Sequence, residues 1–169
     1  NADWSDLVHA LERTSGQRLV NWADVWIRRR GMPQVDVAWT CEGNELSRLT
    51  ISQRGVLNAG DLWPLTTQIL LDYGEQEPVR LRVELIGRTL NVAEAAGKPC
   101  PRYIFANDQD FAYGRFLLDE RSRQEVMEQL GTTRDVFRRA LLWGSLWESV
   151  RELQLDPRQY IELAVKSLP

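Results

Sequence analysis

Apolar side chains recur every three or four positions over the first thirty residues, and this period predicts two amphipathic helices between residues 4 and 30. Leu7, Val8 and Leu11 share one face of the first helix, and Gly16 stands where a C-cap glycine would end it. The second helix is expected to stop at residues 31–33, because both glycine and proline occur there. Its apolar stripe consists of Leu19, Trp22, Ala23 and Trp26.

From residue 34 the apolar period changes to two, which predicts short β-strands with one buried face each. The first strand runs from Val35 to Cys41, and turn residues at 42–44 separate it from the second. Because no helical pattern intervenes, an antiparallel β-sandwich fits these strands better than a parallel sheet does. About seven strands are expected, near 35–41, 45–51, 63–71, 79–85, 89–92, 102–106 and 115–118.

After the predicted strands the pattern is helical to the end of the sequence. Asp119 is placed to cap a helix that ends at Gly131, and Thr132 with Asp135 has the spacing of a capping box that opens the next one. The dipeptide at 156–157, Asp then Pro, is typical of the start of a last helix. The middle helix is expected to bury the side that carries Phe137, Ala140, Leu141, Gly144, Trp147 and Val150. The predicted fold class is therefore mixed α and β, an antiparallel β-sandwich flanked by N-terminal and C-terminal helices.

Composition excludes several classes of protein. Of 169 residues, 43% are hydrophobic, which suffices for a core and excludes a wholly disordered chain. The 21 Lys and Arg residues stand against 24 Asp and Glu, and this net charge of -3 argues against a dedicated nucleic-acid binder with a basic face. No apolar run approaches the roughly 20 residues that span a bilayer, so no membrane segment is predicted.

The side chains that usually carry chemistry are scarce. His9 is the one histidine and falls on a predicted helix, where a partly exposed polar residue is the expected role. A zinc site needs three or four clustered ligands, so we expect none here, and neither the dinucleotide fingerprint nor the Walker pattern occurs. Cys41 and Cys100 pair only if the fold brings them together; without a secretory segment in the chain, two free thiols in a reducing compartment are expected.

Two further features have both a functional and a structural interpretation. The acidic turn with Asn107, Asp108 and Asp110 has some calcium-binding residue types but lacks the glycine and the distal Glu of an EF-hand loop, so we interpret it as an ordinary turn. Seven tryptophans are many for this length and suggest either a stacking surface or packing. Trp63 and Trp143 are expected at surfaces that meet other domains; Trp22, Trp26, Trp39 and Trp147 lie on apolar stripes and are assigned to packing.

Four stretches carry a resemblance to a known family. They are a tryptophan-bearing helix followed by Gly31-Met32-Pro33 and a strand, the apolar Trp63-Pro64-Leu65, the turn and strand at 107–115 with 118–120, and the helix at 142–147 with 150–151. In order and spacing they resemble the aminopeptidase N (membrane alanyl aminopeptidase-like) family of zinc metallopeptidases, and the third is similar to the bacterial pattern.

The resemblance implies three parts: residues 3–32 as the terminal helices of the catalytic domain, 33–118 as the β-sandwich domain, and 119–169 as the start of the C-terminal helical domain. It places the family's His-Glu-x-x-His zinc helix, exopeptidase loop and catalytic tyrosine upstream. Tyr103 and Tyr113 are assigned to predicted strands and not to the catalytic role. The resemblance therefore implies no catalytic and no metal-binding residue in this chain, and substrate-binding residues stay unknown.

Three functions remain open on these grounds. The leading one is a non-catalytic segment of a zinc-dependent aminopeptidase that removes N-terminal residues from peptides, with the sandwich as a structural spacer. Its partners would be the upstream catalytic domain and the downstream helical domain of the same polypeptide, with zinc as cofactor of the parent enzyme only. The second is a stand-alone β-sandwich that binds a peptide or carbohydrate, and the third is a self-pairing scaffold. The cytoplasm of a bacterium is the favoured location, and Asn1 and Ala2 are interpreted as remnants of cloning.

Overall fold

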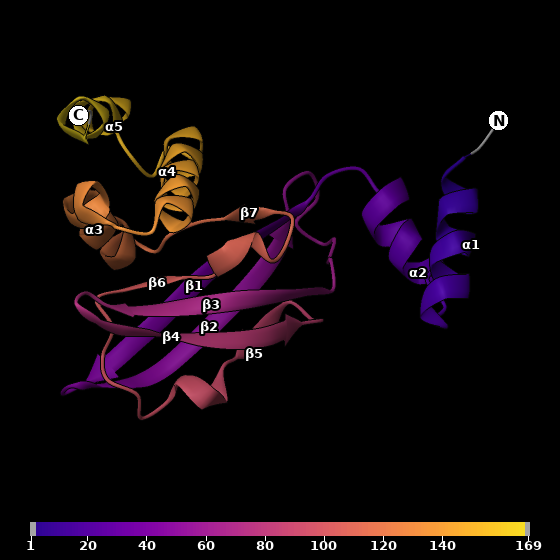
Figure 1. Ribbon diagram of the computed structural model, residues 1–169, viewed down its shortest axis with the longest axis horizontal. Coiled ribbons are helices and arrows are strands. Elements are labelled where there is room, and N and C mark those ends of the chain that lie inside the picture. Colours follow the sequence, from indigo (N-terminus) through magenta and orange to yellow (C-terminus); the bar gives the residue numbers. More distant parts are fainter. Residues whose placement is uncertain (1–2, 168–169) are drawn as a thin grey trace. The chain divides into compact units, whose positions relative to one another are not determined.

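The computed structural model describes residues 3–167, and this part of the chain divides after Gly31 into two compact units. Asn1 and Ala2, which we interpret as remnants of cloning, lie outside the described residues. The first unit contains only helices, whereas the second contains two β-sheets followed by helices (Figure 1).

The first unit begins with α1 (Trp4–Ser15), whose N-terminus is a reciprocal capping box. The Asp3 carboxylate accepts the N–H of Ser5 at 2.7 Å, and the Asp6 carboxylate accepts the N–H of Asp3 at 2.9 Å. Bonds from the Ser5 hydroxyl, and then from the backbone of Ser5 and Asp6, lower the pKa of the Asp3 carboxyl. Gly16 ends the helix at φ 68° with its N–H bonded to the Glu12 carbonyl, which confirms the predicted C-cap.

The second predicted helix is present but changes its winding. It starts as α2 (Val20–Ala23) and continues as a π-helical segment, η1 (Asp24–Arg28), before the backbone becomes extended at Arg29. Few of the apolar side chains in this unit are buried. Those that remain exposed are Trp4, Leu7, Leu11, Val20 and Trp22.

The second unit is built on two sheets. One has four strands in the order β5-β2-β1-β7: β1 (Pro33–Glu42), β2 (Glu45–Gly55), β5 (Thr89–Asn91) and β7 (Arg115–Phe116). The other has three strands in the order β4-β3-β6: β3 (Leu65–Tyr73), β4 (Gln76–Leu85) and β6 (Tyr103–Phe105). Figure 1 shows the β3–β4 pair crossing in front of the β1–β2 pair.

The strand pattern confirms the predicted sandwich-like fold class, since seven strands form two sheets within residues 3–167 and nearly all neighbours are antiparallel. The one exception is the short parallel pairing of β7 with β1, which the alternating pattern did not predict. Side chains at alternate positions form the core, with Val35 and Ile51 from one sheet and Ile69 and Leu85 from the other fully buried.

Trp63 is part of this core, and its predicted place on a surface is wrong. Its side chain is 1% exposed, and its backbone N–H donates to Oε1 of the buried Gln53 at 2.9 Å. Gln53 also donates from Nε2 to the carbonyl of Gly87 at 2.9 Å, so one side-chain amide fixes two connecting segments. Trp63 extends the inward alternation of β3 by one position, which explains its burial.

Cys41 and Cys100 form a disulfide, so the expectation of two free thiols is wrong. Cys41 lies near the end of β1, and the segment before Cys100 runs back along the β1–β2 turn. There the N–H of Cys100 donates to the Asn44 carbonyl at 2.8 Å and the N–H of Gly97 donates to the Leu46 carbonyl at 3.0 Å. The pairing depends on a return of the chain over 59 positions, which local periodicity does not reveal.

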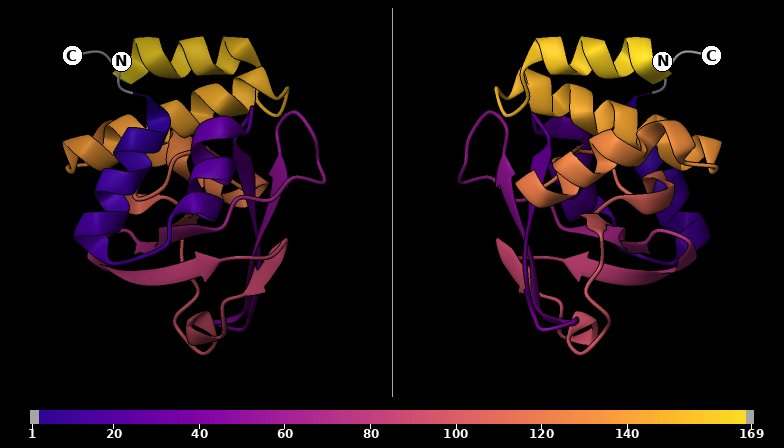
Figure 2. Two further views of the ribbon diagram at one scale, coloured as in Figure 1. Left: turned by 90° about the vertical axis from the view of Figure 1, so that its right-hand side faces the viewer. Right: turned by 90° about the vertical axis from the view of Figure 1, so that its left-hand side faces the viewer.

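Three helices follow the strands and lie in succession along one side of the sheets, seen at the top of both views in Figure 2. They are α3 (Glu120–Gln129), α4 (Val136–Arg151) and α5 (Pro157–Ser167). The Asp119 carboxylate caps α3 by accepting the N–H of Ser122 at 3.1 Å, and the Asp156 carboxylate accepts the N–H of Arg158 at 2.8 Å before α5. Both predicted caps are confirmed.

The predicted boundary between α3 and α4 differs in two details. A 3-10 turn, η4 (Leu130–Thr132), follows α3, and Thr132 donates its hydroxyl to the Gln129 carbonyl instead of capping α4. Asp135 is the N-cap, since its carboxylate accepts the N–H of Arg138 at 3.0 Å. An Asp at the cap itself satisfies the free N–H groups of the first turn as well as the expected threonine would.

The buried face of α4 is largely the opposite of the predicted one. Of the six residues assigned to that face, Val150 alone is buried, and Phe137 and Trp147 are 49% and 50% exposed. α4 carries apolar residues on both sides, so burying apolar surface does not by itself decide which side packs on the sheets. The polar contacts of Arg138 and Ser145 with the sheets decide it. The buried face consists of Arg138, Leu142, Ser145, Leu146, Ser149 and Val150.

Candidate functional site

The most elaborate polar arrangement in the second unit lies where α4 meets the sheets. Buried side chains attach the helix to the strands near its start, at its middle and at its end. Only one of these residues, Asp108, stood out in the sequence as a possible ligand, in this case of a metal ion; Arg115 and Ser145 fell in stretches that carried the family resemblance.

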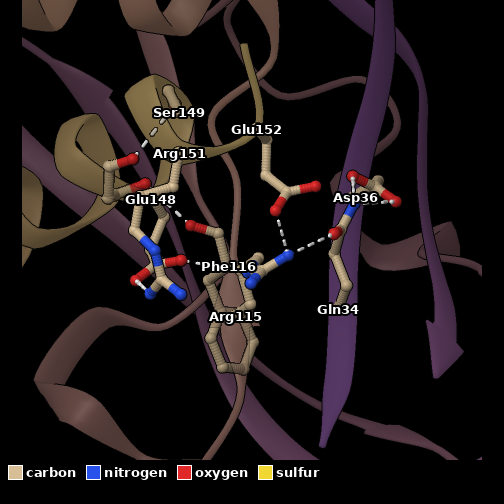
Figure 3. Close-up of polar contacts among 9 residues, drawn as sticks. Gln34, Asp36, Arg115, Phe116, Glu148, Ser149, Arg151 and Glu152 are labelled. Atoms are coloured by element: carbon tan, nitrogen blue, oxygen red, sulfur yellow. Dashed lines mark hydrogen bonds and ion pairs between the residues drawn. The ribbon is translucent and has the colours of Figure 1, made fainter. Parts of the chain in front are cut away.

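Arg115 organises the attachment at the end of α4 (Figure 3). Its guanidinium Nε lies 3.0 Å from Oε2 of Glu148, its Nη1 donates to Oε1 of Glu152, and the same Nη1 lies 3.4 Å from Oε1 of Gln34. The Arg115 side chain is 7% exposed, whereas Glu148 and Glu152 are 23% and 29% exposed. Arg151 on the surface binds the second oxygen of Glu148 at 2.8 Å. A cation from β7 thus neutralises two carboxylates, one in the last turn of α4 and one at its C-cap, where the helix dipole also favours a positive charge.

Gly114 allows Arg115 to reach this position. It has φ 158°, and a Cβ there would lie 2.9 Å from the Pro33 carbonyl oxygen. Only glycine fits this close approach, which brings β7 beside β1 in parallel and places Arg115 next to Gln34. The sequence signal for this site was therefore a single glycine before a basic residue, too common a pair to identify it.

Two serines fix the middle of α4. Ser145 donates its hydroxyl to the Phe116 carbonyl at 2.7 Å, and Ser149 donates its hydroxyl to the Ser145 carbonyl at 3.0 Å. Phe116 lies on β7, the outer strand of its sheet, so the helix satisfies a carbonyl on an otherwise open edge (Figure 3). Both serines are buried, and their small size lets the helix approach the strand closely.

Arg138 attaches the start of α4 to the other sheet. Its Nε lies 3.3 Å from Oδ1 of Asp108 and its Nη1 lies 3.8 Å from Oδ2 of Asp72. The other Asp108 oxygen receives the Nε of Arg80, on β4, at 2.8 Å. Asp108 is completely buried, and two guanidiniums compensate its charge.

The acidic turn is a structural turn, as predicted. Asn107 holds it by accepting the N–H of Ala112 at 2.9 Å on Oδ1 and donating from Nδ2 to the carbonyl of the same residue at 3.0 Å. Gln109 and Asp110 adopt positive φ values of 65° and 52°. This conformation turns the Asp108 carboxylate into the interior, toward Arg80 and Arg138.

A polar cavity of about 880 Å³ opens beside Arg138. Burial raises the pKa of the Tyr103 hydroxyl in its wall, and the adjacent Asp72 carboxylate raises it further. Both signs of charge line the cavity, with a small excess of acidic side chains. The charged lining residues are Asp72, Glu75, Glu77, Arg102, Arg134, Asp135 and Arg138.

Three tryptophans of the second unit make specific side-chain contacts. Trp39 donates its indole N–H to the Asp119 carboxylate at 2.9 Å. Trp143 meets Tyr160 edge to face at 5.3 Å between ring centroids, and Trp147 meets the same ring at 5.6 Å. These contacts connect β1 to the start of α3 and α4 to α5; they agree with the assignment of Trp39 to packing, whereas Trp147 keeps half of its surface exposed.

Ion pairs and hydrogen bonds occupy the polar side chains at this junction. The carboxylates nearest to α4 are paired with arginines, and no group of three or more His, Cys, Asp or Glu within residues 3–167 is placed to hold a metal ion. His9 is exposed on α1. Tyr103 lies on β6, whereas Tyr113 is exposed in the loop before β7, so its assignment to a strand is wrong.

The chain is similar to a bacterial aminopeptidase. No family model matches the chain. The aminopeptidase N of Streptomyces lividans is 28% identical over 183 aligned positions, which take in 99% of this chain and 21% of the relative. The similarity is distant, runs along essentially the whole chain, and spans about a fifth of the length of that bacterial protein. Among the described residues, no helix is both long and apolar enough to cross a membrane.

Proposed function

We propose that the chain is a non-catalytic segment of a zinc-dependent aminopeptidase that removes N-terminal residues from peptides. In this proposal residues 33–118 form a spacer between the end of the catalytic domain, at 3–32, and the start of a C-terminal helical domain, at 119–169. Distant similarity to an aminopeptidase N over 99% of the chain supports it, together with the order of helices, sheets and helices. Zinc, catalytic residues and peptide substrate would belong to other parts of the longer protein.

The single observation that carries the spacer role is the attachment of α4 to both sheets. Arg115 joins the helix to the four-stranded sheet, and Arg138 joins it to Asp108 and Asp72 at the three-stranded one. A helix fixed at both ends by buried ion pairs does not pivot on the strands, because breaking either pair leaves a buried charge. Such a joint would keep the following helices at a fixed orientation.

Exposed apolar side chains favour this proposal over a stand-alone binding module. In the first unit they include Trp4 and Trp22; on the C-terminal helices they include Trp147, Ile161 and Val165. Apolar surface of this kind at both helical ends is typical of faces that meet other domains. The polar cavity beside Arg138 is the feature that favours the binding-module alternative, with a peptide as the better fit, since no tryptophan lines it for sugar stacking.

The donor set of this chain does not fit the family's zinc. His9 is the one histidine and is exposed on α1, and Cys41 and Cys100 are bonded to each other. Neither a pair of histidines nor a free thiolate is therefore present to bind the ion. We therefore derive no catalytic step from these residues. Zinc-dependent release of N-terminal residues by the chain itself, measured by mass spectrometry of short peptides, would contradict the non-catalytic part of the proposal.

The first experiment is to read the encoding DNA around the segment. We expect an open reading frame with a His-Glu-x-x-His motif a few hundred residues upstream of Asp3, on the same polypeptide. A start codon close to Asp3, with no such motif before it, would overturn the proposal and favour the binding module.

The second experiment tests the spacer in the longer protein. We expect Arg115→Met to raise KM for peptides by about threefold or more while kcat on a single-residue chromogenic amide stays within about twofold, because the joint and not the chemistry is changed. Arg151→Met is the matched control, since Arg151 binds the same Glu148 from the surface. Equal kinetics for both variants, despite a loss of stability in Arg115→Met, would contradict the spacer role.

A further inference from the structure

The disulfide between Cys41 and Cys100 lies in an accessible and locally charged setting. Both cysteines are half-buried and neither lies in the core, so we expect a dissolved thiol to reach the bond. Disulfides of cytosolic proteins are mostly transient or redox-sensing, whereas persistent structural ones are typical of oxidising compartments. Exposure places this bond in the labile class.

Arg121 distinguishes the two sulfurs. Its Nη2 lies 3.7 Å from Sγ of Cys100 and 3.4 Å from the Pro101 carbonyl oxygen. Its guanidinium carbon lies 4.2 Å from the centre of the Trp39 ring, which holds the side chain in place. A fixed cation beside one sulfur favours the thiolate form of that cysteine after reduction.

We propose that Cys41–Cys100 is a reversible thiol switch in which Cys100 is the leaving group and Arg121 is the positioning residue that stabilises its thiolate. A thiolate of an external dithiol attacks Sγ of Cys41, and the sulfur–sulfur bond breaks with its electron pair on Cys100. The second thiolate of the dithiol then displaces Cys41 and closes a disulfide. The two cysteines gain two electrons in total, water supplies the proton that Cys41 takes up, and the dithiol is oxidised.

The segment that the switch controls is the stretch from residue 93 to residue 100. Outside the disulfide it is held to β2 and the preceding turn by backbone bonds that join Leu46 to Gly97 and Lys98, and Asn44 to Cys100. These bonds are enough to keep the segment near the hairpin but leave it free to open locally once the covalent link is gone. Reduction is therefore expected to loosen this edge and to leave the rest of the sheets folded.

The test measures reduction of the oxidised chain by dithiothreitol, quenched with N-ethylmaleimide and counted by mass. We expect Arg121→Gln to slow reduction by about two- to fivefold, the range that an exposed charge interaction gives. Arg121→Lys keeps the charge and is expected to retain more than half of the original rate. Arg123→Gln is the matched control on α3 and is expected to leave the rate unchanged, since Arg123 contacts Leu118 and Gln154 instead.

Amide hydrogen exchange distinguishes a disulfide that switches a local segment from one that stabilises the whole unit. On reduction we expect the amides of Leu46, Gly97 and Cys100 to exchange about tenfold faster or more, with the amides of β3 unchanged. The double variant Cys41→Ser with Cys100→Ser should show the same pattern without reductant. Reduction of Arg121→Gln at the original rate, unfolding of the whole unit on reduction, or unchanged exchange in 93–100 would each overturn the proposal.

Discussion

Arg138 and Arg115 both attach α4 to the sheets through ion pairs, but the carboxylates they bind differ in exposure to water. Arg138 faces Asp108, a carboxylate with no exposed surface, whereas Arg115 faces Glu148 and Glu152, which keep about a quarter of their side-chain surface in water. A carboxylate that retains water tolerates the loss of its cation, but a fully buried one does not. We therefore infer that the ion pair at the start of α4 contributes more to stability than the ion pairs at its end.

The largest expected effect comes from Arg138→Met. It leaves Asp108 buried with Arg80 as its remaining cation, and we expect it to lower the free energy of unfolding by about 3–5 kcal/mol. Urea unfolding followed by circular dichroism measures this. Arg139→Met, one position along the helix and outside the cluster, serves as the control. A loss below about 1 kcal/mol for Arg138→Met would show that water reaches Asp108, and the two ends of α4 would then not differ in their dependence on ion pairs.

Arg115→Met is expected to cost less. Glu148 and Glu152 can rehydrate, so a loss of about 1–3 kcal/mol is expected in the same unfolding measurement. Arg151→Met should cost under about 0.5 kcal/mol, because its pair with Glu148 lies on the surface. If Arg115→Met proved more costly than Arg138→Met, exposure of the carboxylates would not be the deciding factor.

Ser145→Ala tests the middle of the helix, between the two ion-pair clusters. The Phe116 carbonyl loses its hydroxyl donor, and a loss of about 1 kcal/mol is expected. Ser149→Ala is the comparison variant, since that hydroxyl bonds only to the carbonyl one turn earlier and contributes less. Equal losses for the two serines would mean that side-chain packing, and not the bond to β7, stabilises the middle.

The smallest expected effect is a pH dependence at the Arg138 end. The pKa of Tyr103 is raised above its ordinary value of 10.0, so the unfolded chain loses this proton first. The contribution of Tyr103 to stability is therefore complete below pH 10 and is lost as the pH rises above 10. Comparing the unfolding free energy of the chain and of Tyr103→Phe between pH 9 and pH 11 should show a shallower decline for the variant. Parallel curves would assign the decline to other tyrosines.

Local pattern predicts much of this fold. Alternation placed the strands, and short-range chemistry placed the helix ends at Gly16, Asp119 and Asp156. These features depend on residues within a few positions of one another, which is the range over which periodicity and capping act.

Long-range pairing accounts for what the sequence did not predict. The disulfide joins residues 59 apart, and Arg115 meets Gln34 across 81 positions. The buried face of α4 followed from Arg138 and Ser145, which reach the distant residues Asp108 and Phe116, although its apolar residues pointed to the other side. Of the candidate site, only the turn around Asp108 was visible beforehand, because an Asx-rich turn is a local signal.

The parallel pairing of β7 with β1 sets an order for synthesis on the ribosome. β1 emerges before its outer neighbour, which is made only when translation reaches residues 115–116. Until then the edge of β1 that β7 later covers is open to other chains, and a nascent protein in this state is a target for chaperones. A pause in translation before the codon for Arg115 would therefore prolong the time in which this edge can mispair.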